Sequence, residues 1–198
     1  ECRTELVRHE DEAQHYCPNE NGCAPQILGK MEHFTHRRAM NIESLGNETI
    51  QQFFEAGFIK NIADIYDLKK NDILTLDRFK EKSAQNIMDG IEASKAAPFE
   101  RVVFALGIRH IGETTAKKLA YYFKDIDALM QANELQLLEV GDIGEITAKS
   151  ITDHFADAGN RKIVERLKRQ GLQFRLSEEM LAGRTEKLAG LTFVVSGV

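Results

Sequence analysis

The chain has 198 residues and a formal net charge of −5, with 42% hydrophobic and 29% charged residues. This composition is ordinary for a soluble globular protein, and no apolar run approaches the ~20 residues of a membrane helix. The acidic balance excludes a protein that coats nucleic acid through bulk positive charge, but it permits local contacts through backbone amides and a few lysines. Because the N-terminus does not resemble a signal peptide, we expect a cytoplasmic protein.

The first segment, residues 1–28, is polar and turn-rich and contains all three cysteines: Cys2, Cys17 and Cys23. So short a segment needs a covalent or metal staple to fold. Clustered cysteines in a cytoplasmic chain bind metal more often than they form disulfides, and thiolates at this spacing suit tetrahedral zinc. The sequence therefore predicts a structural zinc site with no open position for catalysis. The alternative is three unrelated buried thiols.

Three thiolates leave one position of a tetrahedral zinc site to be filled. The simplest completion is a cysteine just before Glu1, in a CxxC pair whose second member is Cys2, and His9 or His15 is the alternative. The chain starts without methionine and stops inside a strand-like run. We therefore expect it to be a fragment of a longer protein.

The next segment, Glu32 to Met40, is the most basic short stretch of the chain. His33 and His36 form either a metal pair or, as we favour, part of a half-buried linker with an exposed arginine face. From Glu32 to about Ala182, apolar residues recur at spacings of three and four, which predicts an almost entirely helical region. The only proline in that region, Pro98, fits a helix entry.

One pattern occurs four times in the helical region: an apolar residue, a turn residue and, four positions after the turn residue, a small or apolar residue near the start of a helix. The turn residues lie 34, 32 and 32 positions apart, and such a period indicates one supersecondary unit used repeatedly. The copies are Leu45-Gly46…Ile50, Phe79-Lys80…Ala84, Ile111-Gly112…Ala116 and Ile143-Gly144…Ala148. Their apolar stripes continue at Phe53, Ile87, Leu119 and Ile151, and then at Gly57, Ile91, Phe123 and Phe155. The predicted unit is a helix, a tight hairpin and a second helix.

These hairpins suit phosphate. Glycine permits a positive φ and a close approach, and the helix that follows offers free N–H groups and a positive dipole end to an anion. Such contacts fix position on a duplex without reading bases, so we expect sequence-independent, salt-sensitive DNA binding. The predicted DNA-binding residues are Arg37, Gly46, Lys80, Lys82, Arg109, His110, Gly112, Thr114, Thr115, Lys117, Lys118, Gly144, Thr147 and Lys149.

The four copies are unequal. The last two combine a turn glycine with threonines and lysines just behind it, whereas Ser44 stands where the first hairpin is expected to have glycine, and the second turn, residues 78–83, has none. A glycine-capped helix connection in a bundle explains any single copy, but four copies in register favour a phosphate-binding role. We therefore expect two strong phosphate grips on a four-part scaffold.

The helical pattern ends after Leu181 at Gly183 and a charged linker, residues 184–187. The β-branched run that follows, Leu191 to Gly197, predicts a single buried strand. Nowhere does the sequence contain a nucleotide-binding glycine loop, a lysine nucleophile motif or a recognisable acid/base pair. No catalytic residues are therefore predicted in this chain.

Three stretches together resemble the bacterial NAD-dependent DNA ligases over essentially the whole chain. They are Cys2…Cys17-Pro18-x4-Cys23-x-Pro25-Gln26, His33-Phe34-x2-Arg37-x-Ala39-Met40-x-Ile42 and Ala105-Leu106-Gly107-Ile108-Arg109-x-Ile111-Gly112-Glu113. The resemblance implies a mainly α protein with three parts. These are a four-cysteine-type zinc finger (1–28, its first cysteine missing), a linker and four-motif helix-hairpin-helix DNA-binding domain (29–183), and a linker with the first strand of a truncated BRCT domain (184–198, the strand at Leu188–Val198).

The same resemblance implies a role in DNA replication and repair: a monomeric region that grips the minor groove across a nick within a complete ligase. In that family an upstream adenylation domain carries the lysine that takes AMP from NAD, and an OB domain follows it. NAD and Mg²⁺ would act only through that catalytic domain, so we expect the present chain to be inactive alone. Besides the missing first cysteine, the chain departs from the family pattern at His36, where serine is commoner, and at Ser44, where glycine is commoner.

Two other functions compete with this interpretation. One is a helix-hairpin-helix repair scaffold that binds branched DNA without ligase activity, and the other is a helical protein-interaction array with no DNA role. The cysteine module favours the ligase, because a repair scaffold has no need of a zinc finger directly before the first repeat.

Overall fold

The computed structural model describes residues 1–8, 13–20, 22–178 and 180, and within these residues the regular secondary structure is almost all helix. The helices in chain order are α1 (Ala24–Thr35), α2 (Asn47–Glu55), the 3₁₀ helix η1 (Asp64–Asp67), α3 (Lys70–Ile73), α4 (Glu81–Ser94), α5 (Phe99–Ala105), α6 (Glu113–Phe123), α7 (Ile126–Gln131), α8 (Glu134–Leu138), α9 (Glu145–Ala156) and α10 (Ala158–Arg169). The mainly α class is therefore confirmed.

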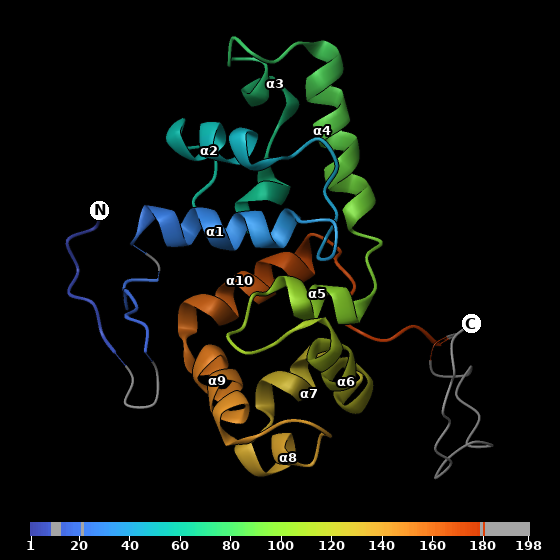
Figure 1. The fold of residues 1–198 in the computed structure, drawn as a ribbon. Helices are drawn as coiled ribbons and strands as arrows, with labels where there is room; N and C mark the ends of the chain where they lie inside the picture. Colours follow the sequence, from blue (N-terminus) through green and yellow to red (C-terminus); the bar gives the residue numbers. More distant parts are fainter. Residues whose placement is uncertain (9–12, 21, 179, 181–198) are drawn as a thin grey trace, which may run out of the picture.

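The helices form two groups stacked along a long axis (Figure 1). Helices α2, α3 and α4 lie at one end, α1 lies across the middle, and α5 to α10 form the other end. Each group contains two hairpin units: α2 and α4 follow the first two turns, and α6 and α9 follow the last two. The predicted repeat is thus built as two successive pairs.

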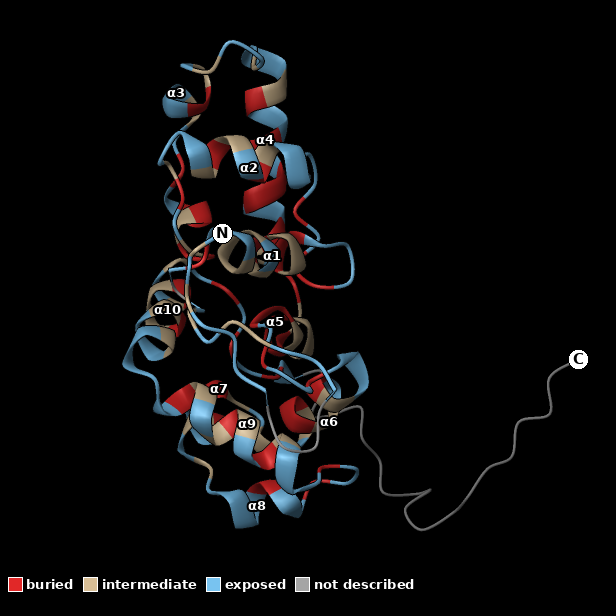
Figure 2. Cartoon of the chain, turned by 60° about the vertical axis from the view of Figure 1, so that its left-hand side comes forward, coloured by how far each residue is buried: buried red, intermediate tan, exposed pale blue. Residues whose placement is uncertain are grey.

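A single hydrophobic cluster runs through both groups, from Met31 to Leu176. Buried residues lie on the sides of the helices that face other helices, and exposed residues lie on the outer sides (Figure 2). The predicted stripe residues Phe53, Ile87, Leu119 and Ile151 are all at most 1% exposed. The 3.6-residue periodicity thus identified the buried faces correctly.

The first repeat departs from its predicted stripe at Gly57. Helix α2 ends at Glu55, and Gly57 is exposed with a φ of 77°, a left-handed conformation that glycine adopts at little cost. The residue terminates the helix rather than extending its apolar face. The first unit therefore has a shorter second helix than the others.

Polar contacts hold the two helix groups together. The Arg101 guanidinium donates to the carbonyls of Ala39 and Arg37, each at 2.7 Å, and His33 Nε2 lies 2.8 Å from the carbonyl oxygen of Phe104. Arg166 also bridges from α10 to Asp64, at 2.7 Å, and to Asp67. These contacts fix the basic linker against α5, so the favoured half-buried linker is observed.

Two predicted segment boundaries can be compared with the helix boundaries of the structure. Pro98 is the residue directly before α5, as expected for a helix entry. Helix α1 begins at Ala24, immediately after Cys23 and inside the segment assigned to the zinc finger. The strand predicted within residues 188–198 lies outside the described residues. None of the helices in the described ranges is long and apolar enough to cross a membrane.

Candidate nucleic-acid interface and metal centre

The four turn residues share one backbone conformation. Gly46, Lys80, Gly112 and Gly144 each directly precede a helix, with φ between −118° and −83° and ψ between 172° and 175°. The carbonyl of each accepts a hydrogen bond, 2.9 or 3.0 Å long, from the N–H four residues later. Lys80 adopts the same geometry as the glycines. The repeat is therefore a backbone repeat, even where its sequence is least similar.

The left-handed positions of the hairpins lie elsewhere than predicted. We expected positive φ at Gly112 and Gly144, but both have negative φ, and the left-handed residues stand two positions before the turn residue: Ser44, His110 and Asp142, with φ of 64° to 66°. Asparagine, aspartate and histidine tolerate this region better than most residues. The second hairpin contains no left-handed residue at the equivalent position, Arg78, so its turn is of a different kind.

The turn glycines leave open space outside the chain. A Cβ atom added at Gly46, Gly112 or Gly144 would meet no atom within 4 Å. Internal packing and φ therefore place no demand for glycine at these positions. A side chain at these positions would block access from outside to the first N–H groups of the helix. Those N–H groups have no acceptor within the helix. This geometry suits an anion that must come close to the backbone.

A hydroxyl residue occupies the third helical position in every copy: Thr49, Ser83, Thr115 and Thr147, all half-buried. Thr115 and Thr147 are predicted from the sequence, whereas Thr49 and Ser83 are not, although they follow the same spacing of 34, 32 and 32. The Ser83 hydroxyl is already used in the protein, since it accepts from the Lys80 N–H and donates to the Lys80 carbonyl, both at 2.9 Å. The second hairpin thus has its own internal cap.

The predicted cations of the last two hairpins already have partners. The Arg109 guanidinium lies 4.0 Å above the ring of Tyr16, Lys118 pairs with Asp142, and Lys149 pairs with Asp153 at 3.0 Å. The ammonium of Lys117 lies 5.9 Å from the ring centre of Tyr121. A phosphate at these hairpins would therefore have to compete with carboxylates for lysine, and the backbone N–H groups are the donors that remain free of that competition.

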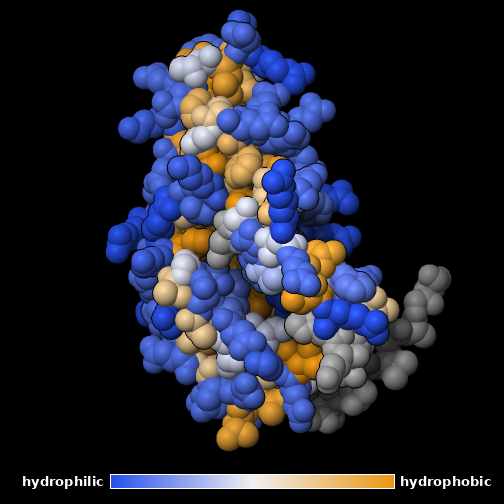
Figure 3. Space-filling model, turned by 90° about the vertical axis from the view of Figure 1, so that its left-hand side faces the viewer, coloured by the Kyte–Doolittle hydropathy of each residue, from blue (hydrophilic) through white to orange (hydrophobic). Residues whose placement is uncertain are grey.

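Other predicted residues are exposed on the surface. Arg37, Lys80, Lys82, His110 and Thr114 are exposed, and neither Lys80 nor Lys82 forms an ion pair with another described residue. Near the third hairpin, Arg38 from the basic linker pairs with Glu113 at 3.3 Å, a link that sequence reasoning missed. Figure 3 shows hydrophilic side chains covering most of one long face, with hydrophobic ones in small groups between them.

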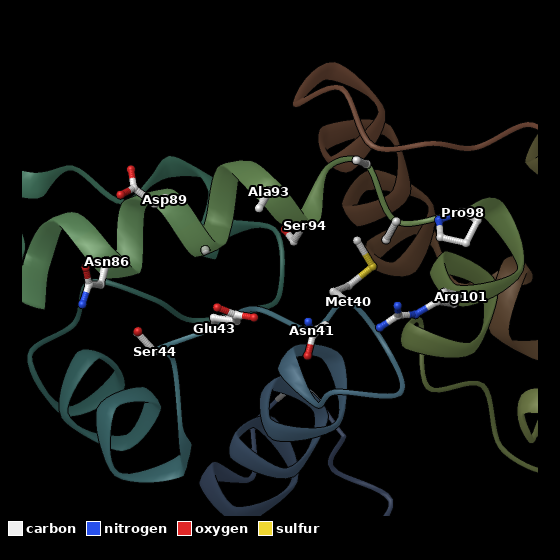
Figure 4. A pocket seen from close by; sticks show the side chains of 13 residues that line it. Met40, Asn41, Glu43, Ser44, Asn86, Asp89, Ala93, Ser94, Pro98 and Arg101 are labelled. Atoms are coloured by element: carbon white, nitrogen blue, oxygen red, sulfur yellow. The ribbon is translucent and has the colours of Figure 1, made fainter.

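Beside the first hairpin lies a polar cleft of about 640 Å³ (Figure 4). Asn86 and Asp89 of α4 and Glu43 and Ser44 of the hairpin are among the residues that line it. A Cβ at Gly90 would lie 2.4 Å from the Glu43 carbonyl oxygen, so α4 and the hairpin pack backbone to backbone. The cleft thus brings two carboxylates, Glu43 and Asp89, beside the first hairpin.

The three cysteines converge before α1. All three Sγ atoms lie within 4.8 Å of one another, and the Sγ atoms of Cys2 and Cys17 are 3.5 Å apart. Thiolates at ~2.3 Å from a tetrahedral zinc are separated by about 3.8 Å, so the spacing of this cluster is close to the one that zinc requires. Cys23 is buried and directly precedes α1, and the Gln26 side chain donates to the Cys17 carbonyl at 2.8 Å. The interpretation as three unrelated thiols is not compatible with this convergence.

The thiols of Cys2 and Cys23 differ in their protonation, and only the pKa of Cys2 is shifted in the direction that favours metal binding. Hydrogen bonds from the side chain and backbone of Thr4 lower the pKa of Cys2 to about 6, whereas burial raises the pKa of Cys23. The thiolate is the form that binds zinc. Of the proposed substitutes for a fourth ligand, His15 lies outside the cluster, and His9 is not among the described residues.

Comparison with protein families matches three parts of the chain. Residues 1–24 match the NAD-dependent DNA ligase C4 zinc finger domain, residues 37–93 match the SAM-like helix-hairpin-helix tandem, and residues 101–164 match the helix-hairpin-helix motif. The matched ranges follow the cysteine cluster and the two pairs of hairpin units in the order in which they occur in the fold.

Curated relatives match along the whole chain. It is 54% identical over 198 residues to proteins named DNA ligase from Christiangramia forsetii and Bacteroides fragilis, and 53% identical to one from Flavobacterium johnsoniae. In each case all of this chain is aligned, and it spans about 30% of the length of the relative.

Proposed function

This chain belongs to the NAD-dependent DNA ligase family, as part of its C-terminal region, and we propose that it binds duplex DNA around a nick for the complete ligase. The observation that carries the proposal is the set of hairpin turns whose glycines are open to the outside. At Gly112 and Gly144 neither packing nor backbone conformation requires glycine, whereas close approach of a phosphate does.

The proposed contacts differ among the four hairpins. The third and fourth provide backbone N–H groups, with Thr115 and Thr147 as further donors. In the second, the unpaired ammonium groups of Lys80 and Lys82 provide charge, and the first hairpin contributes mainly packing. Because the contacts go to phosphates, binding is independent of base sequence and weakens as salt rises.

The zinc ion belongs to the same proposal as a structural group held by Cys2, Cys17 and Cys23 together with a fourth ligand. When bound, it supplies folding energy to a segment that has almost no core of its own. The Tyr16 ring, which lies within that segment, packs against Arg109 of the third hairpin. The finger thereby supports the hairpin that we assign to phosphate.

The chemistry of ligation lies outside this chain in the proposal. Phosphodiester bond formation, and the use of NAD and Mg²⁺, are assigned to the remainder of a ligase. The chain alone is expected to bind nicked DNA as a monomer and to leave the nick open. Incubation with NAD, Mg²⁺ and nicked DNA tests this point, and sealed product would contradict it.

Fluorescence anisotropy with a nicked duplex, measured at several salt concentrations, tests the binding. We expect Gly112→Val and Gly144→Val each to weaken binding by about tenfold or more, a loss of roughly 1.4 kcal/mol, and to reduce the salt slope because phosphate contacts are lost. Gly29→Val is the matched control, since Gly29 is exposed on α1 and a Cβ there also meets nothing within 4 Å.

Two results would decide against the assignment. Unchanged affinity and salt slope in both hairpin variants would show that these turns do not hold phosphate. Tighter binding to a branched junction than to the nicked duplex would favour the repair scaffold instead. The circular dichroism spectrum of each variant confirms that the loss of binding is not a loss of fold.

A further inference from the structure

A second cavity, of about 510 Å³, lies away from the hairpins. Its wall comes from five places in the chain: the cysteine segment, α1, the loop after α2, Leu106 at the end of α5, and helices α9 and α10. None of the predicted DNA-binding residues lines it. Its volume is within the range of small-molecule sites, roughly 300–1,000 Å³.

The lining combines an apolar wall with an excess of cations. Ile27, Met31, Ile62 and Ile163 are among its apolar residues. The charged lining residues are four cations, Lys30, Lys60, Lys162 and Arg166, and one carboxylate, Glu20. This excess stands out in a chain whose net charge is −5.

Two of these cations are available to a ligand. Lys30 is paired with Glu20 at 2.7 Å, and Arg166 is held by Asp64 and Asp67. By contrast, the exposed ammonium groups of Lys60 and Lys162 form no ion pair with any described residue. An anion at the cavity mouth would therefore gain two partners without breaking an ion pair.

A histidine supplies a hydrogen-bond donor at the wall. The Asn160 side-chain Nδ2 lies 3.3 Å from Nδ1 of His154 and 3.0 Å from its carbonyl oxygen. Because the amide nitrogen can only donate, Nδ1 of His154 is the acceptor, and the proton of the neutral ring sits on Nε2. Burial lowers the pKa of His154 to about 4, so the ring is neutral near pH 7. No described residue accepts a hydrogen bond from Nε2.

We propose that this cavity is a binding site for a small amphipathic monoanion, with an apolar body against Ile62 and Ile163 and an acidic group between Lys60, Lys162 and His154 Nε2–H. A carboxylate or a sulfonate satisfies these donors with one negative charge. Because its wall joins both helix groups, a bound molecule stabilises their arrangement and raises the melting temperature. The site is independent of the DNA-binding proposal.

The probe for this site is 1-anilinonaphthalene-8-sulfonate, an apolar body with one negative charge. We expect the full chain to bind it with enhanced fluorescence and the double variant Lys60→Glu/Lys162→Glu to bind about tenfold more weakly or worse. The matched control Lys69→Glu/Lys124→Glu has the same net charge but changes exposed lysines that do not line the cavity. It should retain the wild-type affinity.

A neutral probe separates an anion site from a merely apolar one. N-phenyl-1-naphthylamine lacks the sulfonate, so it should bind more weakly and be insensitive to the lysine reversals. His154→Phe should weaken the sulfonate probe by removing the Nε2 donor. Amide shifts in an NMR titration should centre on Asn160 and Ile163.

The proposal is overturned if the Lys60/Lys162 reversal leaves the affinity of the sulfonate probe unchanged. It is also overturned if the neutral probe binds equally tightly, or if the NMR shifts centre on the exposed side chains of Leu135 and Leu138 instead. Because the two lysines are exposed, their reversal does not depend on the core, and the test survives even if His154→Phe fails to fold.

Discussion

The side chains of single residues in this chain often make contacts with residues that are far away in the sequence. Lys118 was expected to supply charge to phosphate, but it pairs with Asp142, the left-handed residue of the next hairpin. Arg109 lies over Tyr16 of the cysteine segment. Each of these side chains thus links two motifs as well as belonging to one: Lys118 must leave Asp142 to reach a phosphate, whereas Tyr16 positions Arg109.

His154 yields a prediction on pH dependence. Burial, followed by the positive charge of Lys30, lowers its pKa from 6.5 to about 4 in the folded chain. Between those two values the unfolded chain binds more protons than the folded one, so stability falls as pH is lowered from about 6.5 to 4. The carboxylates of Glu20 and Asp157 oppose this shift.

The full effect of this titration amounts to about 3 kcal/mol. Urea unfolding at several pH values between 7 and 4 measures this effect. The quantity to compare is the slope of the free energy of unfolding against pH in the wild type and in His154→Phe. The variant should lack this part of the decline, whereas His36→Gln, at an exposed histidine, should retain it. Parallel curves for the wild type and His154→Phe would refute the assignment.

Among the elements, α4 and α1 present two helical glycines in opposite settings. A Cβ at Gly90 would lie 2.4 Å from the backbone oxygen of Glu43, which cannot move without shifting the first hairpin. A Cβ at Gly29 meets nothing within 4 Å. The close contact, rather than conformational freedom, is what requires glycine in α4, since neither glycine has a positive φ.

This contrast predicts opposite effects of one substitution. Gly90→Ala should destabilise the chain by about 1–3 kcal/mol through overpacking, whereas Gly29→Ala should stabilise it by about 0.5–1 kcal/mol through helix propensity. Thermal and urea unfolding of the two variants and the wild type measures the change in the free energy of unfolding, which should be opposite in sign for the two variants. A neutral Gly90→Ala would mean that α4 and the first hairpin are not in close contact.

At the scale of the whole molecule, the cysteine segment and the helical body differ in what stabilises them. The continuous hydrophobic cluster begins at Met31, after the segment. Before α1, the described backbone pairing is a single antiparallel bridge between Val7 and Tyr16, with two hydrogen bonds of 2.7 Å. We therefore expect the segment to depend on a bound metal for its fold and the helical body to fold without one.

Removal of zinc tests whether the cysteine segment depends on metal while the helical body does not. A strong chelator should release one zinc ion per chain, loosen residues 1–23 and expose them to proteolysis, while the helical circular dichroism signal stays nearly constant. Cys17→Ser should reproduce this state without a chelator. Cooperative loss of the whole helical signal on chelation would show instead that the body also depends on the metal.

Chelation should also weaken DNA binding, because Arg109 loses its Tyr16 support. Tyr16→Ala in the zinc-loaded chain isolates that contact, and we expect a smaller loss in the anisotropy assay than zinc removal causes. Equal affinity in the zinc-loaded and zinc-free chains would separate the finger from the hairpins functionally.

The sequence by itself determined the helical class, the four-copy repeat, the buried stripe and the cysteine cluster. These follow from local periodicity and spacing, which the chain expresses wherever it folds. Only the tertiary structure decided that the left-handed positions are Ser44, His110 and Asp142, that Lys118 is paired, and that a cationic cavity joins the two helix groups. Each of these depends on which segments meet in space, and contacts between distant segments leave no periodic signal in a single sequence.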